Sequence, residues 1–399
     1  MLKYFTNKYK TDWRFSIATL ALLLLLFMTF EIKNGRFDMK DFHVYYVAAD
    51  RLMAGENMYR PVEDGHFHFK YSPESALFFV PLAIFPYGAA RVIFWLILTA
   101  VICANLYMSI LLVKPDFKSD DAGRLNGKIL LAALILGVHA QRELHLGQVN
   151  QILLLMYLGL VLLVRNQKNI SAAALWAISM FIKPYGLIFL PYYLLKKKFK
   201  PIVIFIVFTA GIALTPAAIY GWHGSIIQHG FWLRELSVEL SDKRDLLASA
   251  NHTIFSIMAR YTPLRLIHWS GHSTLIFQVT IIILLAGLFL YLMRRGKGLS
   301  DSSMLESGFL IALIPTLAAT SHNAYGFFEL IVVLILFRWR ELNKIEKSLA
   351  LGGFIFTGGN MYDLVGLKAW QVINNLSIIA IGGLLLLAVV ALIRKRRLA

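Results

Sequence analysis

The chain has 399 residues, of which 58% are hydrophobic and only 16% are charged. Soluble domains are about 45–50% apolar and about 25% charged. The composition therefore excludes a disordered chain, a collagen, a coiled coil and an ordinary soluble enzyme, and it indicates an integral membrane protein. The single cysteine, Cys103, excludes an intrachain disulfide and a cysteine-based metal cluster.

Twelve apolar segments are candidates for membrane helices, since a spanning helix needs about 20 predominantly apolar residues. The first follows a basic stretch without a small-residue cleavage site after it, so we expect an uncleaved helix and not a signal peptide. The sequence predicts an all-α polytopic protein with about 12 transmembrane helices in one membrane domain, 1–399. The segments are 15–30, 88–113, 129–140, 149–164, 170–182, 185–195, 201–220, 273–293, 303–320, 324–337, 349–361 and 372–393.

The charged residues divide between the two sides that these segments define. With the N-terminus inside, 25 of the 40 basic residues and eight of the 23 acidic residues fall in the inner segments. The whole net charge of +17 is then inside, and the outer balance is zero, as the positive-inside rule predicts. The basic character therefore reports membrane topology and contact with anionic lipids, not nucleic acid. Both termini are expected in the cytoplasm.

Two predicted outer regions, 31–87 and 221–272, are longer than plain connections, and long loops in compact proteins are usually functional or disordered. In the first, 44–52 and 75–85 are expected to form amphipathic helices on the membrane surface. The second contains Trp222 and Trp232, which suit an aromatic interface belt. The chain has no evident internal repeat, although many transporters have one.

Polar residues cluster at the predicted outer ends of the helices, where ionisable groups are candidates for function. Asp41 lies where the first outer region enters a predicted helix, with Asp38 three residues before it. One interpretation is an N-cap, which fits Asp38 better than Asp41. A second is a general base. A third is a cation site formed by both carboxylates.

Four further clusters lie on the same predicted side. The stretch 139–151 is too polar for a simple hairpin, and its amide and imidazole groups suit sugar hydroxyls and phosphate oxygens. Lys183, beside Pro184, is either a snorkelling lysine or a point charge for an anionic headgroup. The other two clusters are 249–253 and 321–325. Glu329 follows His322 by seven residues and would share its helical face.

Several of these motifs resemble those of glycosyltransferase family 87, the bacterial mannosyltransferases that depend on polyprenol-phosphate mannose. The resemblance runs from Asp38 to Tyr325, and His252 stands where the family has Gln. The matching elements are Asp41 to Ala49, Gly55, Tyr59, Tyr71-Ser72-Pro73, Gly147-Gln148-Val149-Asn150, Ile182-Lys183-Pro184, Asn251-His252-Thr253 and Ser321-His322, where a doubled His is absent.

The resemblance implies a GT-C fold and a site that faces outward from the bacterial inner membrane. It implies transfer of a sugar, with mannose expected, from a polyprenyl-phosphate donor to a glycolipid, glycan or protein acceptor, with inversion. Asp41 would be the general base. Lys183, His252, His322 and Arg142 would bind the donor phosphate. The sugar or acceptor would contact His145, Gln148, Asn150, Tyr45, Tyr185 and Asn251. We expect no cofactor and no metal.

Two other classes remain open at this point. A lipid or polysaccharide transporter or flippase should carry polar residues near the middle of its helices and should be built from two related halves. A non-enzymatic envelope assembly protein would use the long outer regions to bind a partner. Release of lipid phosphate with glycosylation of an acceptor separates the enzyme from both.

Overall fold

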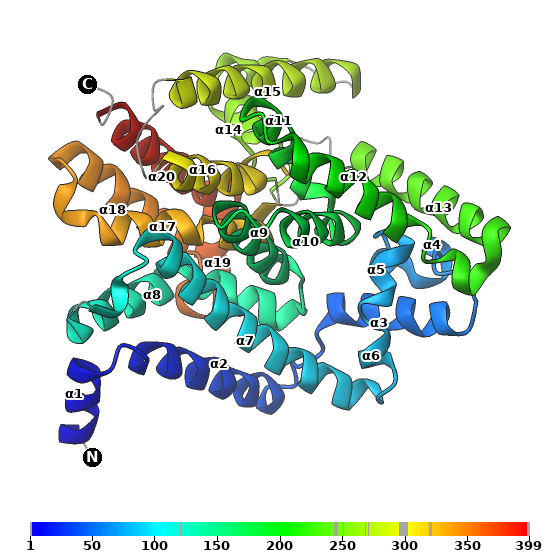
Figure 1. Ribbon diagram of the computed structural model, residues 1–399, viewed down its shortest axis with the longest axis horizontal. Helices are drawn as coiled ribbons and strands as arrows, with labels where there is room; N and C mark the ends of the chain where they lie inside the picture. Colours follow the sequence, from blue (N-terminus) through cyan, green and yellow to red (C-terminus); the bar gives the residue numbers. More distant parts are fainter. Residues whose placement is uncertain are drawn as a thin grey trace. The chain divides into compact units, whose positions relative to one another are not determined.

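A computed structural model describes residues 2–119, 121–242, 246–249, 251–267, 269, 271–294, 302–318 and 321–396. These residues form helices, and the described part of the chain has no strand (Figure 1). The chain divides into two compact units, which are described separately below. The first unit is Met1–Leu20, Leu106–Ala140 and Ser241–Ala399, and the second is Ala21–Asn105 and Gln141–Leu240.

Five helices are long and apolar enough to cross a membrane, counted over the described residues. A sixth candidate is the pair α12 (Phe199–Ala213) and α13 (Ala217–Asp242), which is bent by 93°. The all-helical prediction is confirmed, while the number of twelve spans stays a prediction. The five helices are α2 (Phe15–Lys33), α7 (Tyr87–Val113), α8 (Ala122–Leu146), α15 (Gly271–Arg294) and α20 (Ile378–Arg396).

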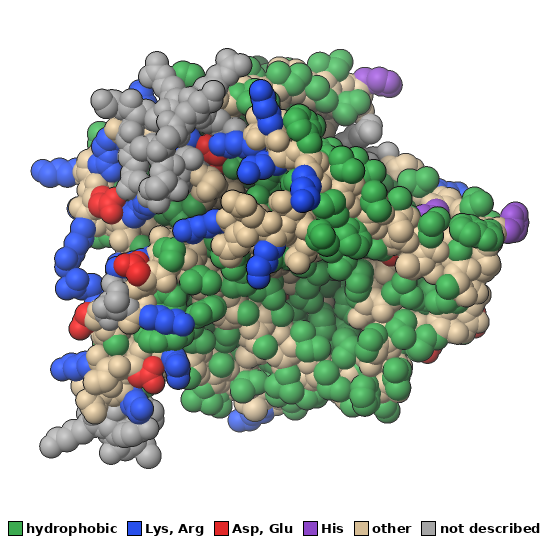
Figure 2. All heavy atoms as spheres, in the orientation of Figure 1, with side chains coloured by type: hydrophobic (Ala, Val, Ile, Leu, Met, Phe, Trp, Pro, Cys, Tyr) green, Lys and Arg blue, Asp and Glu red, His purple; other side chains and the backbone are tan. Residues whose placement is uncertain are grey.

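Large apolar side chains are exposed along several of these helices. Leu22 and Leu23 of α2 are each 56% exposed, and Ile276 of α15 is 68% exposed. Hydrophobic side chains also cover much of the face shown in Figure 2. A surface of this kind is unfavourable in water, where large exposed apolar patches mark interaction sites or membrane contact. Together with the apolar helices, it fits a multi-pass membrane protein.

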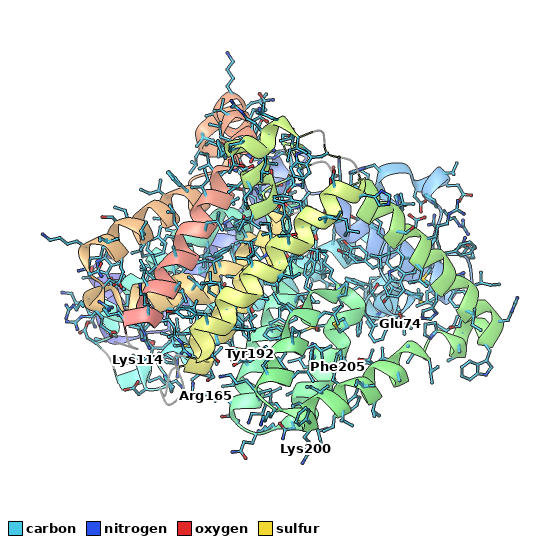
Figure 3. All side chains as sticks on the ribbon, turned by 90° about the horizontal axis from the view of Figure 1, so that it is seen from above. Glu74, Lys114, Arg165, Tyr192, Lys200 and Phe205 are labelled. Atoms are coloured by element: carbon cyan, nitrogen blue, oxygen red, sulfur yellow. The ribbon has the colours of Figure 1, made fainter. Side chains whose placement is uncertain are left out.

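The second unit contains a packed set of short apolar helices: α9 (Asn150–Arg165), α10 (Asn169–Ile182), α11 (Phe189–Leu195) and α12. Trp176 of α10 is fully buried and stacks on Phe205 of α12, with ring centroids 4.0 Å apart. Its indole N–H donates to the carbonyl of Gly186, at 2.8 Å. Figure 3 labels Phe205 of α12 and Tyr192 of α11. This packing fixes the short segment between α10 and α11, which contains Lys183.

The first outer region, 31–87, is ordered as several short helices. Its longest helix, α3 (Lys40–Met53), confirms the helix predicted at 44–52. The helix predicted at 75–85 is wrong as a single element, because the structure has α5 (Pro73–Leu77) and α6 (Val80–Ala83) with a break between them. Pro81 has no N–H with which to continue the helical hydrogen bonds from α5. The remaining elements are α4 (Pro61–Asp64) and η1 (Gly65–Phe67).

Most of the described residues in the second predicted outer region are helical. Gly221, with φ of 65°, bends α13 near its start, after which the helix continues to Asp242. The side chain of His229 on this helix contacts Glu74 Oε1 of α5 at 2.7 Å (Figure 3 labels Glu74). His68 and Glu235 form a second such contact, at 2.9 Å. These contacts hold α13 on the first outer region. Further along lie α14 (Ile254–Tyr261) and η4 (Pro263–Leu266).

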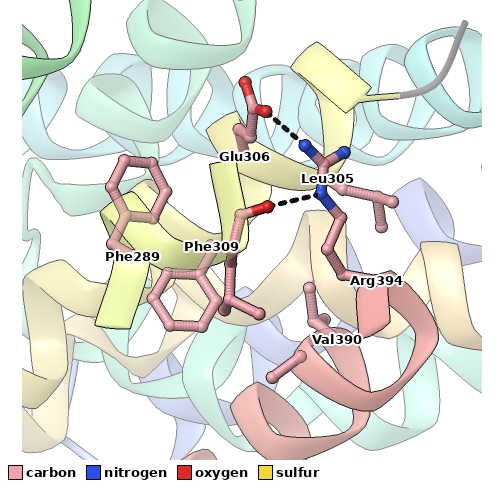
Figure 4. A pocket seen from close by; sticks show the side chains of 8 residues that line it. Phe289, Leu305, Glu306, Phe309, Val390 and Arg394 are labelled. Atoms are coloured by element: carbon pink, nitrogen blue, oxygen red, sulfur yellow. Dashed lines mark hydrogen bonds and ion pairs between the residues drawn. The ribbon is translucent and has the colours of Figure 1, made fainter. Parts of the chain in front are cut away.

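In the first unit, the helices α16 (Ser302–Leu317), α18 (Lys344–Gly358) and α20 pack together. Glycine allows close approach, because a Cβ on Gly353 of α18 would lie 2.6 Å from Leu386 of α20. Arg394 of α20 forms a buried ion pair with Glu306 of α16, at 2.6 Å, in a pocket with apolar walls (Figure 4). The buried guanidinium is thereby paired with a carboxylate, as a charge at this depth requires.

The predicted segment 372–393 spans two helices, which corrects the sequence-based boundary. The chain leaves α19 (Tyr362–Asn375) and enters α20 at Ile378. Ser377 between them has φ of 48°, and this left-handed conformation ends the first helix. The last elements of the unit are α1 (Leu2–Thr11), η2 (Phe117–Ser119), η5 (Ser321–Phe328), α17 (Glu329–Phe337) and η6 (Trp339–Glu341).

Contacts within the first unit join segments that the charge pattern assigns to the same side. Among predicted inner segments, the side-chain amide of Asn126 donates to the carbonyl of Asp12 at 2.8 Å, and Arg396 pairs with Glu346 at 3.3 Å. Ser377 lies near the predicted outer end of the segment 372–393, and its hydroxyl donates to the carbonyl of Asn251 in the second predicted outer region. The grouping agrees with the predicted topology, whose orientation in the membrane stays a prediction.

Candidate functional site

The site is built around the turn that follows α8. Gly147 has φ of 69°, a left-handed conformation that favours glycine. The backbone N–H groups of Gly147 and Gln148 both donate to the carbonyl of Glu143, at 2.9 and 3.0 Å, and so end the helix. A Cβ on Gly147 would lie 2.6 Å from Cβ of Phe42. Glycine is therefore required twice, and it lets the turn approach α3 closely.

Asp41 lies in the first turn of α3 and faces this turn. Its Oδ2 accepts a hydrogen bond from the side-chain amide of Gln148. Its Oδ1 accepts none from the residues that the structure describes. The N-cap of α3 is Met39, without a side-chain capping bond, so the interpretation of Asp38 as the cap is wrong. Asp38 is exposed, and its contribution is a backbone carbonyl that accepts from the Tyr87 hydroxyl.

Lys183 has an extended backbone conformation and connects α10 to η3 (Pro184–Ile188). Its ammonium donates to Oδ1 of Asn150 at 2.8 Å and to Oε1 of Gln148 at 3.3 Å. The rings of Tyr71 and Tyr185 each lie with their centroids 5.8 Å from Nζ, within range of cation–π attraction. Gln148 thus connects the carboxylate of Asp41 to the ammonium of Lys183 through one amide group.

Burial changes the proton affinity of both charged groups. It raises the pKa of Asp41 above its usual value, against the opposing effects of the Gln148 hydrogen bond and of nearby Lys183, His66 and Lys70. Burial lowers the pKa of Lys183, against the effects of Glu143 and Asp41. His66 and Lys70 come from the first outer region and were not singled out from the sequence.

Glu143 is the main participant that sequence reasoning left out of the site. Its carboxylate is buried, and it accepts from the backbone N–H of Gln151 at 2.7 Å and from the amide of Asn150 at 3.2 Å. Asn105 of α7 bonds the side chain of Gln151 at 2.7 Å. The sequence signal that could have identified Glu143 is an acidic residue near the end of an apolar helix, four positions before a glycine.

The remaining predicted residues of the second unit differ in burial and in their hydrogen-bond partners. Tyr45 is buried, and its hydroxyl donates to that of Tyr71 at 2.8 Å. His145 contacts Glu31 at 2.5 Å. Arg142 is half-buried on α8. The structure therefore brings Asp41, Gln148, Asn150, Lys183, Tyr45 and Tyr185 into one connected group.

The other predicted residues belong to the first unit. Oδ1 of Asn251 accepts from the backbone N–H and the hydroxyl of Thr253, and Thr253 in turn caps α14. His252 is buried, and its carbonyl accepts from the Tyr325 hydroxyl. The side chain of His322 lies outside the described residues.

The predicted common face of His322 and Glu329 is wrong, because the chain between them is not an α-helix. Residues Ser321–Phe328 form the 3₁₀-helix η5, and α17 begins only at Glu329. The seven-residue spacing therefore does not place the two on one helical face. Glu329 is buried and accepts from the hydroxyl of Ser109 at 3.0 Å.

A comparison with protein families agrees with the resemblance. The chain matches the sequence model of Glycosyltransferase family 87 over residues 69–321, which is more than half its length. The protein belongs to this family, and it is therefore a glycosyltransferase. The matched range includes Glu143, Gln148, Asn150 and Lys183 and begins after Asp41. Neither the curated proteins nor the solved structures that were compared contain a match.

Proposed function

We propose that this protein transfers a sugar, with mannose expected, from a polyprenyl-phosphate donor to a lipid-linked or glycan-linked acceptor, with inversion at the anomeric carbon. The observation that carries the proposal is the connection of Asp41 to Lys183 through Gln148. A carboxylate with a raised pKa and a cation thus lie in one group at the ends of apolar helices. This is the pairing that a base and a phosphate leaving group need.

The chemical step follows from the roles of these two groups. Oδ1 of Asp41 takes the proton of the acceptor hydroxyl while the hydroxyl oxygen attacks the anomeric carbon from the face opposite the phosphate. The bond between that carbon and the phosphate oxygen breaks, and the electron pair leaves with the polyprenyl phosphate. The ammonium of Lys183 stabilises the charge on the leaving phosphate. No general acid is required, because a phosphate leaves without protonation.

The other proposed contacts follow the sequence prediction. The sequence prediction also assigns binding of the phosphate to Arg142, His252 and His322. The sugar and acceptor contact His145, Gln148, Asn150, Tyr45, Tyr185 and Asn251, whose side chains include the hydroxyl, amide and imidazole groups suited to sugar hydroxyls. A GT-C fold with about 12 membrane helices, and a site on the outer face of the bacterial inner membrane, are part of the same proposal.

Family membership favours this proposal over a transporter or flippase. The arrangement of the polar group also favours it, since Asp41, Gln148 and Lys183 come from the start of a helix and from segments between helices. Transporter sites are typically formed near the middle of the membrane by broken helices from related repeats.

Membrane vesicles that contain the full chain, supplied with radiolabelled polyprenyl-phosphate mannose, test the reaction directly. We expect free polyprenyl phosphate to appear together with label in a glycolipid, glycan or protein fraction. Movement of intact labelled donor across the bilayer without release of lipid phosphate would instead establish the flippase alternative.

Reporter fusions test the orientation separately. Fusions within 196–200 should be cytoplasmic, and fusions within 223–238, on α13, should be external. A cytoplasmic result for α13 would contradict the outward-facing site, because α13 is bonded to the same outer region that carries Asp41.

A further inference from the structure

We propose that Glu143 is a positioning residue that fixes the direction of the Asn150 amide, so that an amide oxygen and not an NH₂ group faces the ammonium of Lys183. This inference rests on the proposed function, because it assigns Lys183 to the donor phosphate. It adds a residue whose side chain does not itself bond Lys183.

The first step of the argument is the direction of each hydrogen bond. An ionised carboxylate accepts hydrogen bonds and donates none, and an ammonium donates and accepts none. Asn150 lies between the two, with Nδ2 3.2 Å from Glu143 Oε2 and Oδ1 2.8 Å from Lys183 Nζ. Only one orientation of the amide satisfies both neighbours.

The second step is that the same arrangement occurs twice around Lys183. Gln148 donates from Nε2 to the Asp41 carboxylate and accepts at Oε1 from Lys183. Asn150 does the same between Glu143 and Lys183. Each of two carboxylates therefore orients one amide, and both amide oxygens point at the same ammonium.

The third step concerns the charge of Lys183. Its polar contacts with the described residues are the two amide oxygens, and neither carboxylate lies within ion-pair distance of Nζ. A direct ion pair would occupy the donor and offset the charge that an anionic ligand needs. Placing neutral amides between the charges holds the ammonium in position and leaves one of its three N–H bonds for a phosphate oxygen.

A purely structural role for Glu143 is the alternative, because the carboxylate also accepts from the backbone N–H of Gln151 at the start of α9. Glu143→Gln separates the two roles. The Gln carbonyl oxygen can still accept from Gln151, but its NH₂ group then faces the NH₂ group of Asn150. The Asn150 amide must turn over, which presents its NH₂ group to Lys183.

Binding of a short-chain polyprenyl phosphate to the purified full chain, measured by titration calorimetry, tests the inference. We expect Glu143→Gln to weaken binding about tenfold, as loss of one hydrogen bond to a charged group does. Asn150→Leu leaves Glu143 and Gln151 in place, and it should weaken binding as much as Glu143→Gln does.

Two results would overturn the inference. The first is wild-type binding by Glu143→Gln. The second is wild-type binding by Asn150→Leu, and it decides between the two roles if the Glu143 variant does not fold. In each case Lys183→Ala should still bind weakly. If Lys183→Ala also binds like wild type, the assignment of Lys183 to the phosphate fails, and the proposed function fails with it.

Discussion

Two polar turns of similar composition have different roles in this molecule. In the turn at 147–151, the side chains bond partners far away in the chain, such as Asp41 and Lys183. In the turn at 251–253, the side chain of Asn251 bonds Thr253 two residues on, and Thr253 caps the helix that follows. Residue type alone does not separate the two turns. The sequence distance between partners does.

The difference in partners is also a difference in electrostatics. The first turn connects two carboxylates and an ammonium through neutral amides. The bonds described for Asn251 and Thr253 are between neutral groups and satisfy backbone donors. We therefore expect substitutions around the first turn to change catalysis and substitutions of the cap in the second to change stability.

The largest effect is expected for Asp41→Asn. The substitution keeps the shape and can still accept from Gln148, but it removes the proton acceptor. General base catalysis contributes about 10²–10⁴ in rate, so turnover in the vesicle assay should fall by that factor while binding of polyprenyl phosphate remains.

Asp38→Asn is the matched control. Asp38 is exposed and lies three residues before Asp41, and its backbone carbonyl, not its side chain, accepts the described hydrogen bond from Tyr87. Its turnover should stay within about twofold of wild type, because surface substitutions of this kind cost little. A loss in Asp38→Asn with none in Asp41→Asn would assign the base to the wrong carboxylate.

The sequence predicts the class of fold well and the site in part. Long apolar segments predict helices, because burial of the backbone in lipid leaves few alternatives. Asp41 and Gln148 are 107 residues apart in the chain, so no local sequence pattern predicts their hydrogen bond. The sequence shows that Glu143 is polar, but it does not show that Glu143 orients the Asn150 amide, because that role depends on where Asn150 lies in space. The breaks at Pro81 and Ser377 depend on local backbone conformation, which apolar periodicity does not report.

Lys183→Ala should have the next largest effect. The ammonium carries the charge that the donor phosphate meets, and loss of such a contact costs about 1.5–3 kcal/mol. Binding of polyprenyl phosphate should therefore weaken about ten- to a hundred-fold. Lys183→Arg is the companion variant: it keeps the charge but not the fit to two amide oxygens, so its binding should be intermediate. Wild-type binding in Lys183→Ala would leave a snorkelling lysine as the better interpretation.

The dependence of the rate on pH should report Asp41. Only the deprotonated carboxylate accepts the acceptor proton, and burial raises its pKa. The value of kcat/KM should therefore be constant above that pKa and fall about tenfold for each pH unit below it. The midpoint should lie above the value of about 4 that is usual for aspartate. The residual activity of Asp41→Asn should lack this acidic limb; if the limb persists unchanged, another group titrates.

The smallest effect on catalysis is expected at the second turn. Thr253→Val keeps the volume of the side chain but removes the hydroxyl that accepts from the backbone N–H of Ser256, and with it the cap of α14. Loss of an N-cap costs about 1 kcal/mol, so the thermal midpoint of the purified chain should fall by a few degrees. Turnover per folded molecule should stay near wild type, because Thr253 serves the backbone of its own turn. A loss of turnover without a loss of stability would show that the second turn also takes part in transfer, and the contrast between the turns would then lie only in how each side chain is held.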